Sequence, residues 1–363
     1  MRHGYRSLAS HGRHHDAARR IAYTAVDGRI PLVAQDLMTE SLIVAAIALL
    51  VTTALEPANL KLLRRFNFGV RHTLRDDIDN RAFVALHARK EGTPDVGGAL
   101  SVAVTLAGLL FLWEPETRAV AVGLAAFGLI GLIDDVVKVR RRRSGRGRDL
   151  GALPKLVMEA AAGAATGFAV HAAGTRSLTA PFFGEIGLGY WIVPVTALTV
   201  IALSNAVNIT DGLDGLAGLL LVLSLGAVAL AAALAGREAA AGAALVGIAT
   251  LLPFLYLNLY PARMIMGDGC ALGMGALLGG VAIVADQGLL LVFVSLVFLV
   301  EAASSFAQIV ALRMGRRVFA IAPLHHHLEA TGWPEPRVTR TLWLAGAVAT
   351  ALGLGVSAAL GYV

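Results

Sequence analysis

The 363-residue sequence has little of what soluble proteins rely on. Only 15% of its residues are charged, 6% are aromatic, and Cys270 is its one cysteine. A single cysteine cannot form a disulfide within the chain, and it cannot supply a cysteine-rich zinc site. Soluble domains carry about 25% charged residues, so this composition excludes a disordered chain and most soluble enzymes.

The sequence instead has a high hydrophobic content and long apolar segments. Hydrophobic residues make up 56% of the chain, and its mean hydropathy is +0.69. Because a membrane-spanning helix needs about 20 apolar residues, we predict an all-α, polytopic integral membrane protein with about ten transmembrane helices. These lie near 39–57, 96–113, 117–136, 154–174, 190–208, 214–235, 239–258, 269–285, 287–311 and 341–362. Residues 1–37 form a polar tail, and 38–363 form one ten-helix domain.

The distribution of positive charge predicts the orientation. Twenty-two of the 31 Lys and Arg residues fall in loops after odd-numbered spans, and three fall in loops after even-numbered spans. Basic residues mark cytoplasmic loops, so the odd loops are expected in the cytoplasm and both termini outside. The net charge of +6 therefore reflects membrane topology, and no nucleic-acid partner is expected. The basic tail disagrees with an outside N-terminus, and a start at Met38 would remove the conflict.

Two acidic motifs lie at cytoplasmic ends of spans. Lys138 lies four residues after Asp134 and three residues after Asp135, spacings that place the lysine on the same helix face as each carboxylate. Paired carboxylates of this kind can bind Mg²⁺ together with substrate phosphates; the alternative is an ordinary polar helix end. The second motif repeats polar side chains every three residues, at Asn205, Asn208, Asp211 and Asp214.

Further polar segments belong to the same predicted face. Asp268 begins the eighth span, where it would cap a helix, bind a metal, or do both. His325, His326 and His327 are consecutive, so they do not share a helix face and do not have zinc spacing. Lys90 and Thr93 precede a glycine-rich turn that could offer N–H groups to an anion, although it is not a P-loop.

Together these segments would form one cytoplasmic cluster of carboxylates, amides, lysines and histidines. Such a set suits phosphoryl transfer, which depends on positioning and charge stabilisation. A transporter would instead carry ionisable groups at mid-bilayer depth. Among the acidic residues, only Glu301 and Glu159 lie away from the ends of the predicted spans. A site at the membrane surface suits one lipid-borne and one water-soluble substrate.

The motifs resemble those of the polyprenyl-phosphate N-acetylhexosamine-1-phosphate transferase superfamily. Residues 134–138 match its DDxxK motif, and residues 208–215 match NxxDGxDG. Residues 322–338, APLHHHLEATGWPEPRV, are similar to the branch of phospho-N-acetylmuramoyl-pentapeptide transferases. The resemblance runs from about Leu74 to Trp343.

This resemblance implies ten spans and an Mg²⁺-dependent transferase of peptidoglycan biosynthesis in the bacterial inner membrane, with its active site cytoplasmic. Such enzymes transfer phospho-MurNAc-pentapeptide from UDP-MurNAc-pentapeptide to undecaprenyl phosphate, giving lipid I and UMP; a homodimer is a possible assembly. The alternatives are a sibling GlcNAc-1-phosphate transferase that uses another UDP-HexNAc, an inactive paralogue, or a lipid-linked transporter. By resemblance the catalytic residues are Asp134, Asp135, Asp268 and Lys138, and the metal ligands are Asp268 and Asp211. The substrate-binding residues are Lys90, Thr93, Asn208, Asp211, Asp214, Asn258, His325, His326 and His327.

Several positions depart from the family pattern. The motif GTPTMGG has Asp95 in place of its second threonine, and FMGDTGS has Ile265 in place of its aromatic residue. Gly269 and Cys270 follow Asp268 where the family has threonine and glycine. The aromatic residue is expected to stack on uracil, so Ile265 predicts weaker nucleotide binding.

Overall fold

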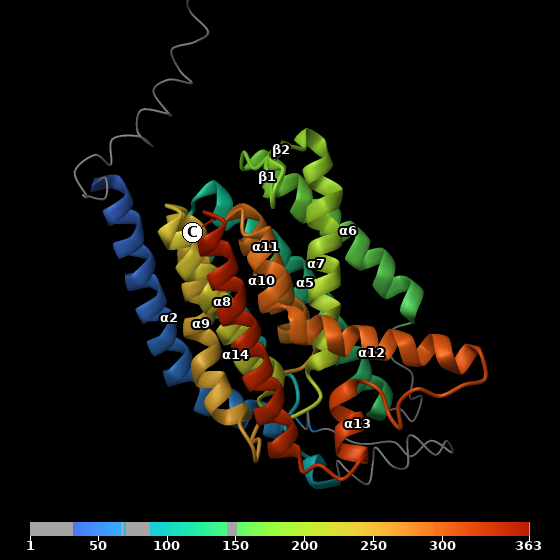
Figure 1. Cartoon of the computed structure of the whole chain (residues 1–363). Helices are drawn as coiled ribbons and strands as arrows, with labels where there is room; N and C mark the ends of the chain where they lie inside the picture. Colours follow the sequence, from blue (N-terminus) through green and yellow to red (C-terminus); the bar gives the residue numbers. More distant parts are fainter. Residues whose placement is uncertain (1–31, 67–68, 70–87, 144–150, 363) are drawn as a thin grey trace, which may run out of the picture.

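The computed structural model describes residues 32–66, 69, 88–143 and 151–362 (Figure 1). Its longer helices are α2 (Leu32–Arg65), α4 (Ala99–Leu112), α5 (Pro115–Arg143), α6 (Ala152–Ala172), α7 (Ile192–Thr210), α8 (Leu216–Leu234), α9 (Glu238–Asn258), α10 (Asp268–Val284), α12 (Leu296–Arg313) and α14 (Glu335–Ala359). Short helices are η1 (Ala88–Lys90), η2 (Gly189–Trp191), α11 (Gly288–Val294) and α13 (Leu324–Ala330). Residues 1–31 of the predicted tail lie outside the described part, and 32–37 begin α2.

Every predicted span is helical, but the count of ten is supported only in part. Within the described residues, seven helices are long and apolar enough to cross a membrane: α2, α5, α7, α8, α9, α12 and α14. Helices α4 and α10 are shorter, and α6 carries Lys155 and Glu159. The ninth predicted span divides at Ser295 into α11 and α12.

The chain also contains a small hairpin that the all-α prediction omitted. Strands β1 (Ser177–Ala180) and β2 (Gly184–Gly187) pair antiparallel, with Leu178 opposite Ile186. Phe182 in the connecting turn and Gly184 at the start of β2 have positive φ, a backbone conformation that glycine adopts without strain. Four residues per strand were too few for the hydropathy pattern to reveal.

Helix α10 lies at the centre of the bundle, and all its residues from Gly269 to Val284 are buried. Small residues make this possible, because they let neighbouring backbones approach closely. A Cβ atom on Gly275 would lie 2.6 Å from Cα of Ser204 in α7, and one on Gly273 would lie 3.2 Å from Cα of Gly128 in α5. This close packing fixes Asp268, the first residue of α10, between α5 and its neighbours.

The two ends of the bundle differ. The start of α2, the hairpin and the C-terminus lie at one end, and α13 lies at the other (Figure 1). Helix α12 crosses the long helices at a large angle and contacts α13 (Figure 1). The polar motifs of the sequence gather at the α13 end.

Candidate active site

Two lysines join two aspartates at the centre of this end. Nζ of Lys138 lies 2.7 Å from the carboxylate of Asp268 and 3.2 Å from that of Asp134. Nζ of Lys155, from α6, lies 3.4 and 3.5 Å from the same two carboxylates. The predicted helix face of Asp134 and Lys138 is confirmed. Lys155 was given no role by the sequence analysis, and it is the α6 residue that completes this group.

Asp135 has a different task from its neighbour Asp134. Its carboxylate accepts hydrogen bonds from the backbone N–H groups of Asp268 (3.2 Å) and Gly269 (3.0 Å). These are unsatisfied donors of the first turn of α10. Asp268 therefore does not cap its own helix; a carboxylate from α5 does, and Asp268 keeps its side chain for the lysines.

The glycine-rich segment of residues 92–98 packs against the segment before α10. The N–H groups of Gly97 and Gly98 donate to the carbonyls of Ile265 (2.8 Å) and Met266 (3.0 Å), and Ile265 N–H donates to Pro94 (2.8 Å). Glycine is required because a side chain at 97 or 98 would overlap Met264 or Cys270. The departures Ile265 and Cys270 thus lie in this junction, and Cys270 is buried beneath Gly98.

Lys90 ties the 211–215 turn to the start of α14. Its Nζ lies 2.8 Å from the Asp214 carboxylate and 2.7 Å from that of Glu335. The Asp214 N–H also donates to Glu335 (2.8 Å). Burial alone would lower the pKa of Lys90, but Glu335 and Asp214 outweigh it, and the pKa lies above its ordinary value. Glu335 was missed by sequence reasoning; its signal was its place in the GWPEP stretch.

Asp211 is half-buried among other carboxylates. Burial raises its pKa well above the ordinary value, and the charges of Asp95 and Asp268 raise it further, against the opposing effect of Lys90. The departure at Asp95 therefore adds negative charge here. Excess carboxylate charge of this kind suits a hard divalent cation, which prefers oxygen ligands. Among the described residues, no three carboxylate, histidine or cysteine side chains converge as a complete metal site.

The predicted residues Asn258, Asn208 and Thr93 differ in burial and in the contacts they make. Asn258 is buried, and its amide accepts from Gly215 N–H (3.1 Å) and donates to the Met264 carbonyl (2.9 Å). It therefore joins two loops of the site. Asn208 is half-buried on α7, and Thr93 is half-buried with its N–H donating to the Lys90 carbonyl (3.0 Å).

Two of the three histidines lie at the 211–215 turn, and the third does not. Nδ1 of His325 lies 3.0 Å from the Glu301 carboxylate, and Nδ1 of His326 lies 2.9 Å from that of Glu329. The Nε2 atoms of both converge over Gly212, where any side chain would overlap His325. Nδ1 of His327 instead accepts a hydrogen bond from Ala320 N–H (3.1 Å). His325 and His326 thus join the 211–215 turn, and His327 holds the preceding loop.

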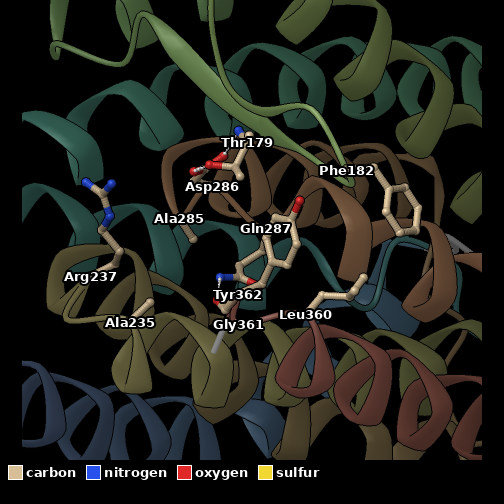
Figure 2. Close-up of a pocket in the computed structure, with 11 residues that line it drawn as sticks. Thr179, Phe182, Ala235, Arg237, Ala285, Asp286, Gln287, Leu360, Gly361 and Tyr362 are labelled. Atoms are coloured by element: carbon tan, nitrogen blue, oxygen red, sulfur yellow. Dashed lines mark hydrogen bonds between the residues drawn. The ribbon is translucent and has the colours of Figure 1, made fainter.

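A pocket of about 550 Å³ lies at the opposite end of the bundle (Figure 2). The hairpin, the α8–α9 and α10–α11 turns and the C-terminal residues line it, including Arg237, Asp286 and Tyr362. The carboxylate of Asp286 accepts hydrogen bonds from Thr179, which joins the hairpin to the end of α10 (Figure 2). None of the predicted site residues lines this pocket.

Comparison with known proteins identifies the family of the chain. The model of glycosyl transferase family 4 matches residues 117–286, which include Asp134, Asp211 and Asp268. The chain is 36% identical to a phospho-N-acetylmuramoyl-pentapeptide-transferase of Desulforudis audaxviator, over 89% of this chain and 100% of that protein. It is 33% identical to the protein of the same name from Clostridioides difficile, over 85% of this chain and 94% of that protein. The chain therefore belongs to the phospho-N-acetylmuramoyl-pentapeptide-transferase family.

Proposed function

We propose that the protein transfers phospho-MurNAc-pentapeptide from UDP-MurNAc-pentapeptide to undecaprenyl phosphate, giving lipid I and UMP. The observation that carries this proposal is the cluster in which Lys138 and Lys155 contact the carboxylates of Asp134 and Asp268. In this family member, His325 and Lys90 also contact the 211–215 turn. Cations beside carboxylates suit two anionic substrates and the charge that develops during phosphoryl transfer.

In the net reaction, a bond forms between the β-phosphorus of the donor and a phosphate oxygen of undecaprenyl phosphate. The bond from that phosphorus to the oxygen that bridges it to the α-phosphate breaks, so UMP leaves. Lys138 and Lys155 would offset the negative charge on the phosphates. A phosphate monoester is mostly dianionic near pH 7, its second pKa being about 6. The acceptor therefore needs little proton removal, and alignment by this chain's residues contributes most.

Mg²⁺ is the cofactor we propose, and Asp268 and Asp211 would hold it. The carboxylates around Asp211 supply oxygen donors only, which is the ligand chemistry that Mg²⁺ prefers. When bound, the ion would neutralise charge on the transferred phosphoryl group. Asp135 keeps Asp268 in place through the start of α10.

The protein is a multi-pass membrane protein by its apolar helices and its family. We propose that it lies in the bacterial inner membrane with the α13 end in the cytoplasm. The bias of basic residues towards the odd loops supports this orientation. A homodimer is the assembly we would test first.

A UMP-release assay on purified protein with Mg²⁺ and undecaprenyl phosphate tests the proposal. UDP-MurNAc-pentapeptide and UDP-GlcNAc are compared as donors, and turnover is expected with the first. UMP from UDP-GlcNAc alone would instead indicate a sibling transferase, and no UMP from either would indicate an inactive paralogue. Asp268→Asn should abolish turnover, and full activity in that variant would reject the metal role.

A further inference from the structure

Helix α12 carries a row of three buried polar side chains. Glu301, Ser304 and Gln308 are spaced three and four residues apart, so they share one face. They are 0%, 6% and 5% exposed. The other face of α12 exposes large apolar side chains such as Phe306 and Ile309. Polar groups inside an apolar helix are costly unless they are paired, so each of the three requires a partner.

All three bind one segment, the 318–325 stretch that leads into α13. Oε1 of Gln308 accepts from the N–H groups of Val318 (3.2 Å) and Phe319 (2.9 Å). Oγ of Ser304 accepts from Leu324 N–H (2.9 Å). Glu301 accepts from His325 N–H (3.2 Å) and from its ring at Nδ1 (3.0 Å). The row therefore fixes this segment along its whole length.

His325 is the end point of the row. Both His325 and Glu301 are fully buried, and the pairing at Nδ1 fixes the orientation of the imidazole ring. Nε2 is left facing Gly212, next to Asp211, and it has no hydrogen-bond partner among the described residues. A buried ring nitrogen without a protein partner at the edge of the site is suited to a ligand.

We propose that Glu301 is a positioning residue, which holds His325 so that Nε2 hydrogen-bonds the sugar-nucleotide donor over Gly212. This inference rests on the proposed transferase function. The other titratable groups beside the ring are Asp211, which precedes Gly212 on the turn, and His326 with its partner Glu329 on α13. Glu329 pairs with His326, so Glu301 is the carboxylate assigned to His325.

The test is a double-mutant cycle of Glu301→Gln and His325→Gln, with the KM of each substrate measured by UMP release. Glu301→Gln should raise the KM for UDP-MurNAc-pentapeptide about tenfold, the effect of one lost hydrogen bond to a ligand. The KM for undecaprenyl phosphate should stay within twofold. In the His325→Gln background, Glu301→Gln should have no further effect, because it acts through the ring. Glu301→Asp, which keeps the charge, should restore part of the donor affinity.

Glu159→Gln is the matched control. Glu159 is also a buried acid on an apolar helix, but it accepts from Asn205 (2.8 Å) on α7. A general loss of packing would lower the thermal midpoint in both variants and would leave the donor KM unchanged. An unchanged donor KM in Glu301→Gln, or effects that multiply in the double mutant, would overturn the inference while wild-type turnover stands. Absence of UMP from the wild type would instead refute the proposed function. If Glu301→Gln does not fold, Glu301→Asp carries the same cycle.

Discussion

The carboxylate of Asp135 holds the backbone of Asp268, the residue on which the proposed metal site depends. Its two oxygens accept from the N–H groups of Asp268 and Gly269, at 3.2 and 3.0 Å. Gly267 occupies the position before α10 and has no side chain with which to cap it. The adjacent carboxylates of Asp134 and Asp135 thus differ in role: Asp134 meets the lysines, and Asp135 orients α10.

Asp135→Asn should therefore impair both stability and catalysis. Asparagine keeps one acceptor oxygen and directs an amide group at a backbone donor, so the cap loses about 1 kcal/mol of stability. The kcat for UMP release should fall at least tenfold, since Asp268 would shift. Thermal unfolding and turnover are the measurements. Glu116→Gln, at the far end of α5, should change neither, and a kcat for Asp135→Asn equal to that of the wild type would contradict the positioning role.

Metal addition should stabilise the protein through Asp211. Because the pKa of Asp211 is raised, the folded chain binds its proton more tightly than the unfolded chain. Its contribution to stability is present at low pH and is lost as the pH rises through the raised pKa. At pH 8 in EDTA, Asp211→Asn should raise the thermal midpoint, and excess Mg²⁺ should stabilise the wild type more than this variant.

Asp286→Asn is the control for this effect. Asp286 binds Thr179 at the opposite end of the bundle, so this variant should respond to Mg²⁺ as the wild type does. An equal Mg²⁺ shift in Asp211→Asn and the wild type would exclude Asp211 as a ligand.

The charge of Lys90 should stabilise the fold throughout the neutral and mildly basic pH range. Its pKa is raised, so its stabilising effect is fully present below its unfolded pKa of about 10.4 and disappears only as the pH rises through the folded value. Lys90→Gln leaves Asp214 and Glu335 facing each other, and it should lower the thermal midpoint equally at pH 7 and pH 9. Arg89→Gln, whose side chain is 47% exposed, should have a smaller effect. A loss confined to one of the two pH values would contradict the assignment.

Gly212→Ala should weaken donor binding without unfolding the chain. An added methyl group would overlap Nε2 of His325 and come within 3.0 Å of Nε2 of His326, so both rings must move. A rise of roughly tenfold or more in the donor KM is expected from such misplacement. Gly226→Ala in α8 is the control, because its new methyl group would meet only Ile248, at 4.0 Å. Equal KM values for the two variants would show that His325 and His326 do not touch the donor.

The sequence predicted what depends on local spacing. Asp134 and Lys138 are four residues apart, and any helix through them places both on one face, as the structure shows at 3.2 Å. Each apolar segment coincides with a helix, although α2 and α5 extend well beyond the predicted bounds. The division of the ninth span at Ser295 and the hairpin at Ser177–Gly187 were not found, because both depend on a few residues within apolar or short stretches.

The sequence by itself determined the class of protein, its helices and the residue types that carry the chemistry, because hydropathy and helical periodicity are local properties. Only the tertiary structure decided which of those residues meet. Lys155, Glu301 and Glu335 reach their partners from 113, 24 and 121 residues away along the chain, since helix packing around α10 brings their elements to one end. The sequence alone indicates that burying the Glu301 carboxylate within a span costs free energy. Its partner His325 is evident only from the packing of α12 against α13.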